Sequence, residues 1–194
     1  LRPGLRVVGV DADARWLDRQ RPVVVGDAAR LPFGSGRFDA SYARLVLRHL
    51  RDPGAACREM ARVVRPGGAV LVGDTDDGTL VLDPEPPGFG EVPAARHEGF
   101  RRRGADPRIG RRLPRLLVDA GLGDVAARVL PVSTAALPAA TFAAVVLAPI
   151  ADAIDPDLLP AERVADVARG LETWARTPGA FGSTTAVFAG GRRG

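Results

Sequence analysis

Short apolar runs alternate with polar, helix-like segments through the first 75 residues of the chain. Runs rich in valine cover residues 6–11, 22–28 and 69–75, and each ends in polar residues, which is typical of buried strands. A further strand is expected near residues 38–46. The intervening segments predict helices. One follows residue 11, and another begins at Asp52-Pro53, carries Glu59 on its exposed side and stops at residues 66–68.

The pattern changes after residue 83. Residues 83–108 are rich in proline, glycine and charge, which favours a lid or linker over a core segment. An amphipathic helix is then expected over residues 109–124, with Gly121 as its cap, followed by a strand near residues 125–134. Two helical stretches and a final strand complete the chain, over residues 137–154, 160–176 and 181–190.

Strands that alternate with helices predict an α/β fold. We expect a Rossmann-like, doubly wound and mostly parallel sheet with helices on both faces and an antiparallel last strand. Residues 1–194 would form one domain, divided into residues 1–83, a lid or linker at 84–107, and residues 108–194. Helices at about 137–176 would cap a ligand pocket. Ligands of such folds bind beyond the carboxyl ends of the strands, so functional residues should follow each strand.

Composition and charge exclude several classes of protein. The 194 residues are 46% hydrophobic and 26% charged, as in ordinary globular domains. The basic residues are all arginine and are spread along the chain, so the net charge of +4 disfavours a nucleic-acid partner. The single cysteine, Cys57, excludes an internal disulfide and a cysteine-based zinc site, and we expect it to be buried and expect no metal. The apolar stretch 137–150 is too short for a membrane span, and proline interrupts it.

Four motifs in the first 75 residues resemble class I S-adenosylmethionine-dependent methyltransferases. They are "VVGVDAD", "VVVGDAARLPFGSGRFD", "RLVLRHLRDP" and "REMARVVRPGGAVLVGD". Their order and spacing make the match more specific than a lone glycine-rich fingerprint. The likeness is greatest to the branch that includes quinone-biosynthesis and natural-product enzymes. It implies a cytoplasmic enzyme that transfers a methyl group from S-adenosylmethionine to a small, rather apolar acceptor in quinone or secondary metabolism.

The resemblance assigns cofactor contacts to residues that follow the first two predicted strands. Asp11, with Ala12 beside it, stands where the family binds the ribose hydroxyls, and a carboxylate suits that diol. Asp27 and Ala28 stand where the family reads adenine. Structural alternatives are an N-cap role for Asp11 and a turn-forming hydrogen bond for Asp27. Both roles of Asp11 can hold at once.

Arg44 and two histidines are the remaining candidates. Arg44 follows the third strand, where the resemblance implies contacts to the methionine part of the cofactor, against the alternative of a solvent-exposed arginine. His49 matches a family motif often written His-His-Leu, and a packed structural histidine is the competing interpretation. His97 lies in the predicted lid and could contact substrate or simply solvent. If a general base is needed, these two are the candidates.

The family's first strand and glycine-rich turn should precede Arg6 by some tens of residues, and the sequence begins five residues before it. We therefore expect this chain to be part of a longer protein, with a strand supplied by a partner as the alternative. A non-catalytic, methyltransferase-like binding module is a second hypothesis for function. A nicotinamide-dependent oxidoreductase ranks third, because the chain has no lysine for a Tyr-x-x-x-Lys pair. The identity of the methyl acceptor and dimerisation stay open.

Overall fold

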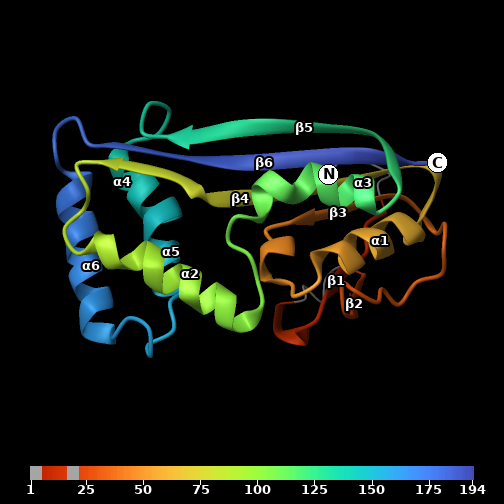
Figure 1. The fold of residues 1–194 in the computed structure, drawn as a ribbon, viewed down its shortest axis with the longest axis horizontal. Coiled ribbons are helices and arrows are strands. Elements are labelled where there is room, and N and C mark those ends of the chain that lie inside the picture. The colour runs from red at the N-terminus through yellow and green to blue at the C-terminus, as the bar shows by residue number, and fades with distance from the viewer. Residues whose placement is uncertain (1–5, 17–21) are drawn as a thin grey trace.

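The computed structural model describes residues 6–16 and 22–194, and the strands of this part of the chain form two separate sheets (Figure 1). The small sheet is a parallel pair, β1 (Gly9–Asp11) and β2 (Val23–Val25). The large sheet has the strand order β3-β4-β6-β5. Its strands are β3 (Phe38–Arg44), β4 (Val64–Asp83), β5 (Leu122–Ser133) and β6 (Phe181–Arg193).

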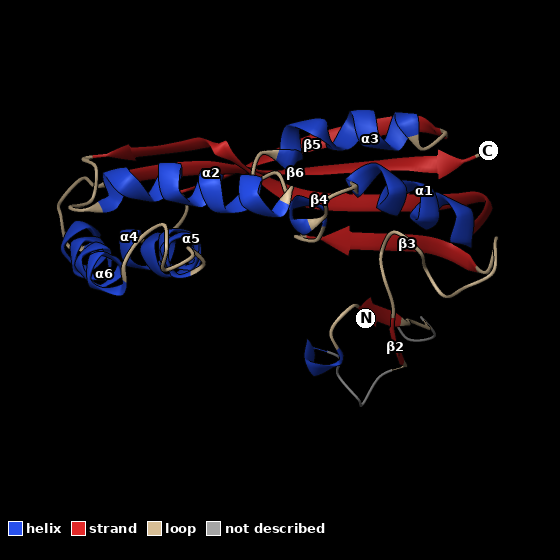
Figure 2. Cartoon of the chain, turned by 60° about the horizontal axis from the view of Figure 1, so that its bottom comes forward, coloured by secondary structure: helices blue, strands red, loops and turns tan. Residues whose placement is uncertain are grey.

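Most strands of the large sheet run in one direction. β3 and β4 are parallel, whereas β6 is antiparallel to both β4 and β5, so β5 shares the direction of β4. The last strand is therefore the antiparallel one, and the predicted α/β class is confirmed. Figure 2 shows β2 below β3, apart from the large sheet.

Helices α1 and α6 begin and end close to where the sequence predicts. In α1 (Pro53–Val63) the N-cap Asp52 accepts a hydrogen bond from the Ala55 N–H at 2.8 Å, and proline occupies the first turn. The other helices are α2 (Val92–Arg103), α3 (Leu113–Asp119), α4 (Ala139–Phe142), α5 (Ala148–Asp152) and α6 (Ala161–Ala175), with a π-helical turn η5 (Ala143–Leu147). Short 3-10 turns are η1 (Ala14–Trp16), η2 (Leu47–His49), η3 (Phe89–Glu91) and η4 (Ile109–Arg112). Within the described residues, none of these helices is long and apolar enough to cross a membrane.

Two predicted elements differ from the structure in extent. The helix expected after residue 11 appears as η1, and residues 17–21 of it lie outside the described residues. The strand expected at residues 69–75 is only the middle of β4, which starts at Val64 directly after α1 and runs through to Asp83. The sequence did not predict this extension, because the residues after Gly73 are polar. Their buried carboxylates pair with arginines from distant segments, which the local sequence does not show.

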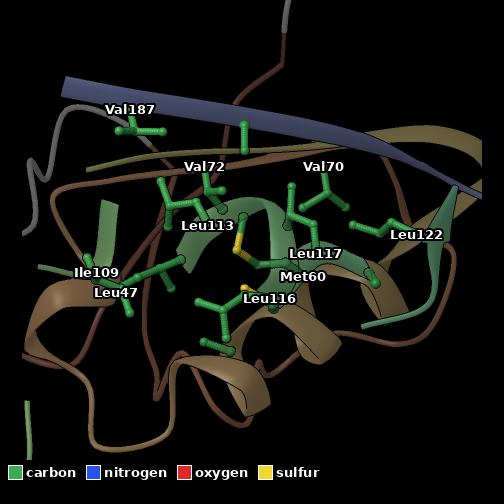
Figure 3. Close-up of a cluster of buried hydrophobic side chains, with 14 of the residues drawn as sticks. Leu47, Met60, Val70, Val72, Ile109, Leu113, Leu116, Leu117, Leu122 and Val187 are labelled. Carbon is green, nitrogen blue, oxygen red and sulfur yellow. The ribbon is translucent and has the colours of Figure 1, made fainter. Parts of the chain in front are cut away.

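A first hydrophobic core lies between α1, α3 and one face of the large sheet. Figure 3 shows Met60 of α1 and Leu117 of α3 converging on Val70 and Val72 of β4. Cys57 is fully buried in the same cluster, as the sequence predicts. This core holds the carboxyl end of β3 in fixed register beside the middle of β4, where Arg44 aligns with Gly73, so side chains there are precisely placed relative to one another.

A second core lies at the other end of β4, among α2, α5 and α6. Its largest buried side chains are Trp174, Phe89 and Phe142, and the Trp174 Nε1–H donates to the Pro84 carbonyl at 2.7 Å. Phe89 and Val92, from the segment expected to be a lid or linker, are also fully buried here. Burial of these two apolar side chains attaches the proline-rich and glycine-rich segment to the second core.

Candidate functional site

Two predicted cofactor residues meet at the carboxyl ends of β1 and β2. Asp11 is the last residue of β1 and aligns with Val25 of β2. The Gly26 N–H then donates to the Asp11 carbonyl at 3.0 Å, which carries the parallel pairing one residue further. Asp27 follows at once, so the structure brings the two carboxylates to one edge of the small sheet.

Each of these carboxylates also makes the local hydrogen bond that the structural alternative requires. Asp11 Oδ1 accepts from the Asp13 N–H at 2.9 Å, and Asp27 Oδ1 accepts from the Ala29 N–H at 2.8 Å. The second oxygen of each accepts no hydrogen bond from the described residues. One oxygen therefore fixes the side chain, and the other stays available to hydroxyl or amine donors, which fits a ribose and an adenine. Ala12 beside them is exposed, and Ala28 packs against the first core.

The loop after Asp27 is tied to α1 by a pair of charged residues. Glu59 accepts a hydrogen bond from the Leu31 N–H at 2.8 Å and pairs with Arg62 at 2.6 Å. Arg62 in turn donates to the carbonyls of Phe33 at 2.8 Å and Leu31 at 3.1 Å. The Arg62 guanidinium and the Leu31 N–H hold the pKa of Glu59 below its usual range. The exposed position predicted for Glu59 was wrong, because the side chain is half-buried beneath this loop.

Arg44 is the last residue of β3 and is exposed, as its alternative interpretation expects. It aligns with Gly73 of β4 in the large sheet, whereas Asp11 belongs to the small sheet. No hydrogen bond or ion pair joins Arg44 to either predicted carboxylate within the described residues. Its assignment to the methionine part of a cofactor stays a prediction.

A buried polar cluster that the sequence analysis missed lies just beyond β3. Arg48 of η2 has a side chain only 8% exposed, and its guanidinium reaches the far part of β4. It donates to Thr75 Oγ1 at 2.6 Å, to Asp77 Oδ1 at 2.6 Å and to the Pro107 carbonyl at 3.2 Å. Its own N–H donates to Asp74, a carboxylate whose pKa burial raises despite the arginine beside it. The cluster links residues that are 26 to 59 positions apart.

An aromatic ring at the foot of α2 extends this cluster. The guanidiniums of Arg48, Arg96 and Arg103 lie 5.4, 4.9 and 5.1 Å from the centre of the Phe100 ring, and the His49 ring stacks on Phe100 at 5.6 Å. Desolvation of the imidazole, and then the three positive charges, lower the pKa of His49. The stacking of its ring on Phe100 supports the structural interpretation, although His49 is exposed at the surface.

A hollow of about 200 Å³ opens beside this cluster, between β4, α2 and α5. Asp77, Arg96 and His97 supply much of its polar lining, while Leu80, Leu82, Phe89, Pro93 and Ile150 supply apolar lining. His97 is exposed and lines the hollow, and His49 does not. Within residues 6–16 and 22–194 no group of three or more histidine, cysteine, aspartate or glutamate side chains is placed to hold a metal ion.

The first part of the chain matches a known protein family. Residues 1–72 match the family model described as "Methyltransferase domain". Demethylmenaquinone methyltransferase of Mycobacterium bovis (strain BCG / Pasteur 1173P2) is 56% identical over 64 residues, which are 33% of this chain and 27% of that enzyme. A 37.1 kDa uncharacterized protein in transposon TN4556 of Streptomyces fradiae is 35% identical over 133 residues, or 61% of this chain and 36% of that protein. The chain thus spans about a third or less of these relatives.

Solved structures share the fold over nearly the whole chain. Phosphoethanolamine N-methyltransferase 2 of Haemonchus contortus, in complex with S-adenosyl-L-methionine, has a TM-score of 0.58 at 17% identity and covers 98% of this chain and 44% of its own. The cyclase SpnF has a TM-score of 0.51 at 21% identity and covers 97% of this chain and 67% of its own. Identities this low establish the fold alone, and these two neighbours carry different activities on it.

Proposed function

We propose that the chain, whose residues 1–72 match the family model described as "Methyltransferase domain", transfers a methyl group from S-adenosylmethionine to a small, rather apolar acceptor. The observation that carries this proposal is the pair of carboxylates, Asp11 and Asp27, at adjacent strand ends inside the matched segment. Each has one oxygen fixed by the backbone, and the other accepts no hydrogen bond from residues 6–16 and 22–194, which suits a nucleoside with hydroxyl and amine donors.

We assign the cofactor contacts by residue. Asp11, with Ala12 beside it, would bind the ribose hydroxyls, since a carboxylate accepts two hydrogen bonds from a diol. Asp27 would accept from the adenine amine, and the Ala28 N–H would donate to the ring. Arg44 would pair with the carboxylate of the methionine part, because a guanidinium forms bidentate pairs with carboxylates.

The bound cofactor supplies an electrophilic methyl group on sulfur. The protein's own share is then mainly to hold the acceptor in line and to keep water away. Residues 1–83 would bind the cofactor, residues 84–107 would act as a lid, and residues 108–194 would complete the acceptor side with the cap at about 137–176. His97, which lines the hollow beside β4, would take up the proton if the acceptor is a hydroxyl.

The acceptor is proposed to be a quinol or a comparable secondary metabolite. The apolar lining of the hollow supports this, since Leu80, Leu82, Phe89 and Ile150 suit a hydrocarbon ring. The likeness to demethylmenaquinone methyltransferase over 64 residues also favours a quinone-type acceptor. We place the reaction in the cytoplasm.

Calorimetric titration with S-adenosylhomocysteine tests the proposal without knowledge of the acceptor. Asp11→Asn should weaken binding by about tenfold or more, the effect of losing a charge-assisted pair of hydrogen bonds. Asp13→Asn is the matched control, because Asp13 lies two residues away and pairs with Arg15. Equal affinity of both variants and the parent protein would contradict the assignment of Asp11.

A second candidate is a methyltransferase-like module that binds a partner protein without catalysis. The separation of β1 and β2 from the large sheet favours it, because both sheets then keep backbone edges that a partner strand could pair with. The same titration separates the two candidates. A parent protein that takes up no S-adenosylhomocysteine at millimolar concentration would favour the binding module.

A further inference from the structure

Arg96 presents unused hydrogen-bond donors to the hollow beside β4. Its side chain is 10% exposed, so it is held almost entirely within the protein, and the residue lines the hollow. Its Nε donates to Asp77 Oδ2 at 2.6 Å, and its Nη1 reaches the Ile150 carbonyl only at 3.5 Å. Nη2 has no hydrogen-bond partner in the described part of the chain. A buried guanidinium with a free donor suits an acceptor atom on a ligand.

Asp77 fixes the direction of that guanidinium. Its two oxygens bind two arginines from different elements, Arg48 after β3 and Arg96 in α2, each at 2.6 Å. Arg48 is itself immobilised by Thr75 and the Pro107 carbonyl. The Arg96 Nε is hydrogen-bonded to the fixed Asp77 carboxylate, so the remaining nitrogens of Arg96 have little freedom. Binding of a ligand would therefore cost little side-chain entropy at Arg96.

The rest of the hollow is shaped for a small apolar body. Its apolar lining comes from β4 (Leu80 and Leu82), η3 (Phe89), the first turn of α2 (Pro93) and α5 (Ile150). Arg108 and Glu85 add one charge of each sign to the lining. Since Asp77 is already matched by two guanidiniums, the lining favours a negative group near Arg96 over a positive one.

We propose that Arg96 selects acceptors that carry an acidic oxygen, such as a carboxylate or phenolate, on an apolar ring, and that Asp77 is the positioning residue that orients it. This inference rests on the proposed function, because it treats the hollow as the acceptor site. The acidic oxygen would bind Arg96 by a charge-assisted hydrogen bond, and the ring would lie against Leu80, Leu82 and Phe89. Selection by Arg96 would restrict the acceptor to an amphipathic acid, where the proposed function allows any small, rather apolar molecule.

Binding of 2-naphthoate, compared with its uncharged methyl ester, tests this selection. The parent protein should bind the acid more tightly than the ester. Arg96→Gln should weaken binding of the acid by about tenfold while changing the ester by less than about twofold, since only the acid uses the charge. Arg101→Gln is the matched control, because Arg101 lies on the same helix, pairs with Glu98 and is exposed.

Asp77 is tested by conservative rescue. Asp77→Asn should reduce the preference for the acid as Arg96→Gln does, and Asp77→Glu should restore part of it, because a carboxylate can again hold the guanidinium. A merely structural role would lower affinity for acid and ester alike. Equal loss for both ligands would therefore overturn the positioning role, and an unchanged acid preference in Arg96→Gln would overturn the selection itself.

The cofactor titration keeps this test separate from the proposed function. Arg96→Gln should bind S-adenosylhomocysteine as the parent protein does, since Arg96 lies in α2 and the assigned cofactor residues lie at the ends of β1, β2 and β3. A protein that shows the Arg96-dependent preference for the acid but takes up no S-adenosylhomocysteine would refute the methyltransferase proposal and leave the anion site standing. The reverse result would refute only the anion site.

Discussion

Two parallel strand pairs of this molecule, β1 with β2 and β3 with β4, have very different surroundings. The residues of β1 and β2 are half-buried or exposed, and Val25 is 54% exposed. In β4, Val70 and Val72 are fully buried beneath α1 and α3. Valine-rich runs thus specify strands in both places, but stability comes from the elements that cover them.

The proposed cofactor carboxylates stand in the less covered pair. Polar contacts attach that strand pair to α1. Glu59 and Arg62 bind the loop that follows Asp27. The large sheet lines the hollow proposed for the acceptor. A loop held by hydrogen bonds from Glu59 and Arg62 follows the proposed nucleotide contact Asp27. Sites commonly lie on such less stable segments of a fold.

The largest difference between the two pairs should appear when apolar side chains are shortened. Leu117→Ala removes a fully buried side chain from the first core and should cost about 2–5 kcal/mol of the free energy of unfolding. Val24→Ala, in half-buried β2, should cost about 1 kcal/mol or less. Urea unfolding, followed by circular dichroism, gives both values. Equal losses at the two sites would show that β1 and β2 are buried as deeply as β4.

A medium effect is expected at the link between the two regions. Glu59→Gln weakens its bonds to the Leu31 N–H and Arg62 and should cost about 1–2 kcal/mol at pH 7. The pKa of Glu59 is lower in the folded protein than its usual 4.5, so its stabilisation is complete above that pH. It is lost as the pH falls through the lowered folded pKa. The gap between parent and variant should therefore narrow below pH 4.5.

Glu172→Gln is the matched control for this pH dependence, because Glu172 is an exposed residue of α6. Its stability should follow that of the parent protein at every pH. A gap between Glu59→Gln and the parent that stays constant from pH 7 to pH 3 would contradict an ionised Glu59 as the source of the attachment.

The sequence predicted the elements whose signals are local. Asp52-Pro53 marks the start of α1 within a few residues, and Gly121, at φ +82°, lies two residues past the end of α3. It missed the extension of β4 through "GDTDDG", because polar residues indicate a turn unless partners for them are known. Arg48 binds Asp74 from 26 positions away, and Arg111 binds Asp76 from 35 positions away. No local sequence pattern predicts these contacts.

Long sequence distances between interacting residues also limit prediction of the candidate site. The motifs located Asp11 and Asp27, because a carboxylate after a strand is a local signal, and the structure brings the two together. Arg48 and Arg96 were overlooked among 27 basic residues, and only contacts over distances of 19 to 59 residues distinguish them from surface arginines. The three closely spaced aspartates of β4 were the signal that could have pointed to buried arginines.

The smallest effect should come from the exposed ion pair nearest to the proposed nucleotide contacts. Arg15 binds Asp13 with two nitrogens and lowers its pKa, yet both side chains face solvent, where water and salt screen such pairs. Asp13→Asn should therefore move the Tm by about 1 °C or less, as should 0.5 M salt added to the parent protein. Differential scanning calorimetry measures both. A shift of several degrees would mean that the carboxyl end of β1 depends on this ion pair for its folding. The difference in cofactor affinity between Asp11→Asn and Asp13→Asn would then reflect folding of the strand end instead of contact with a ribose.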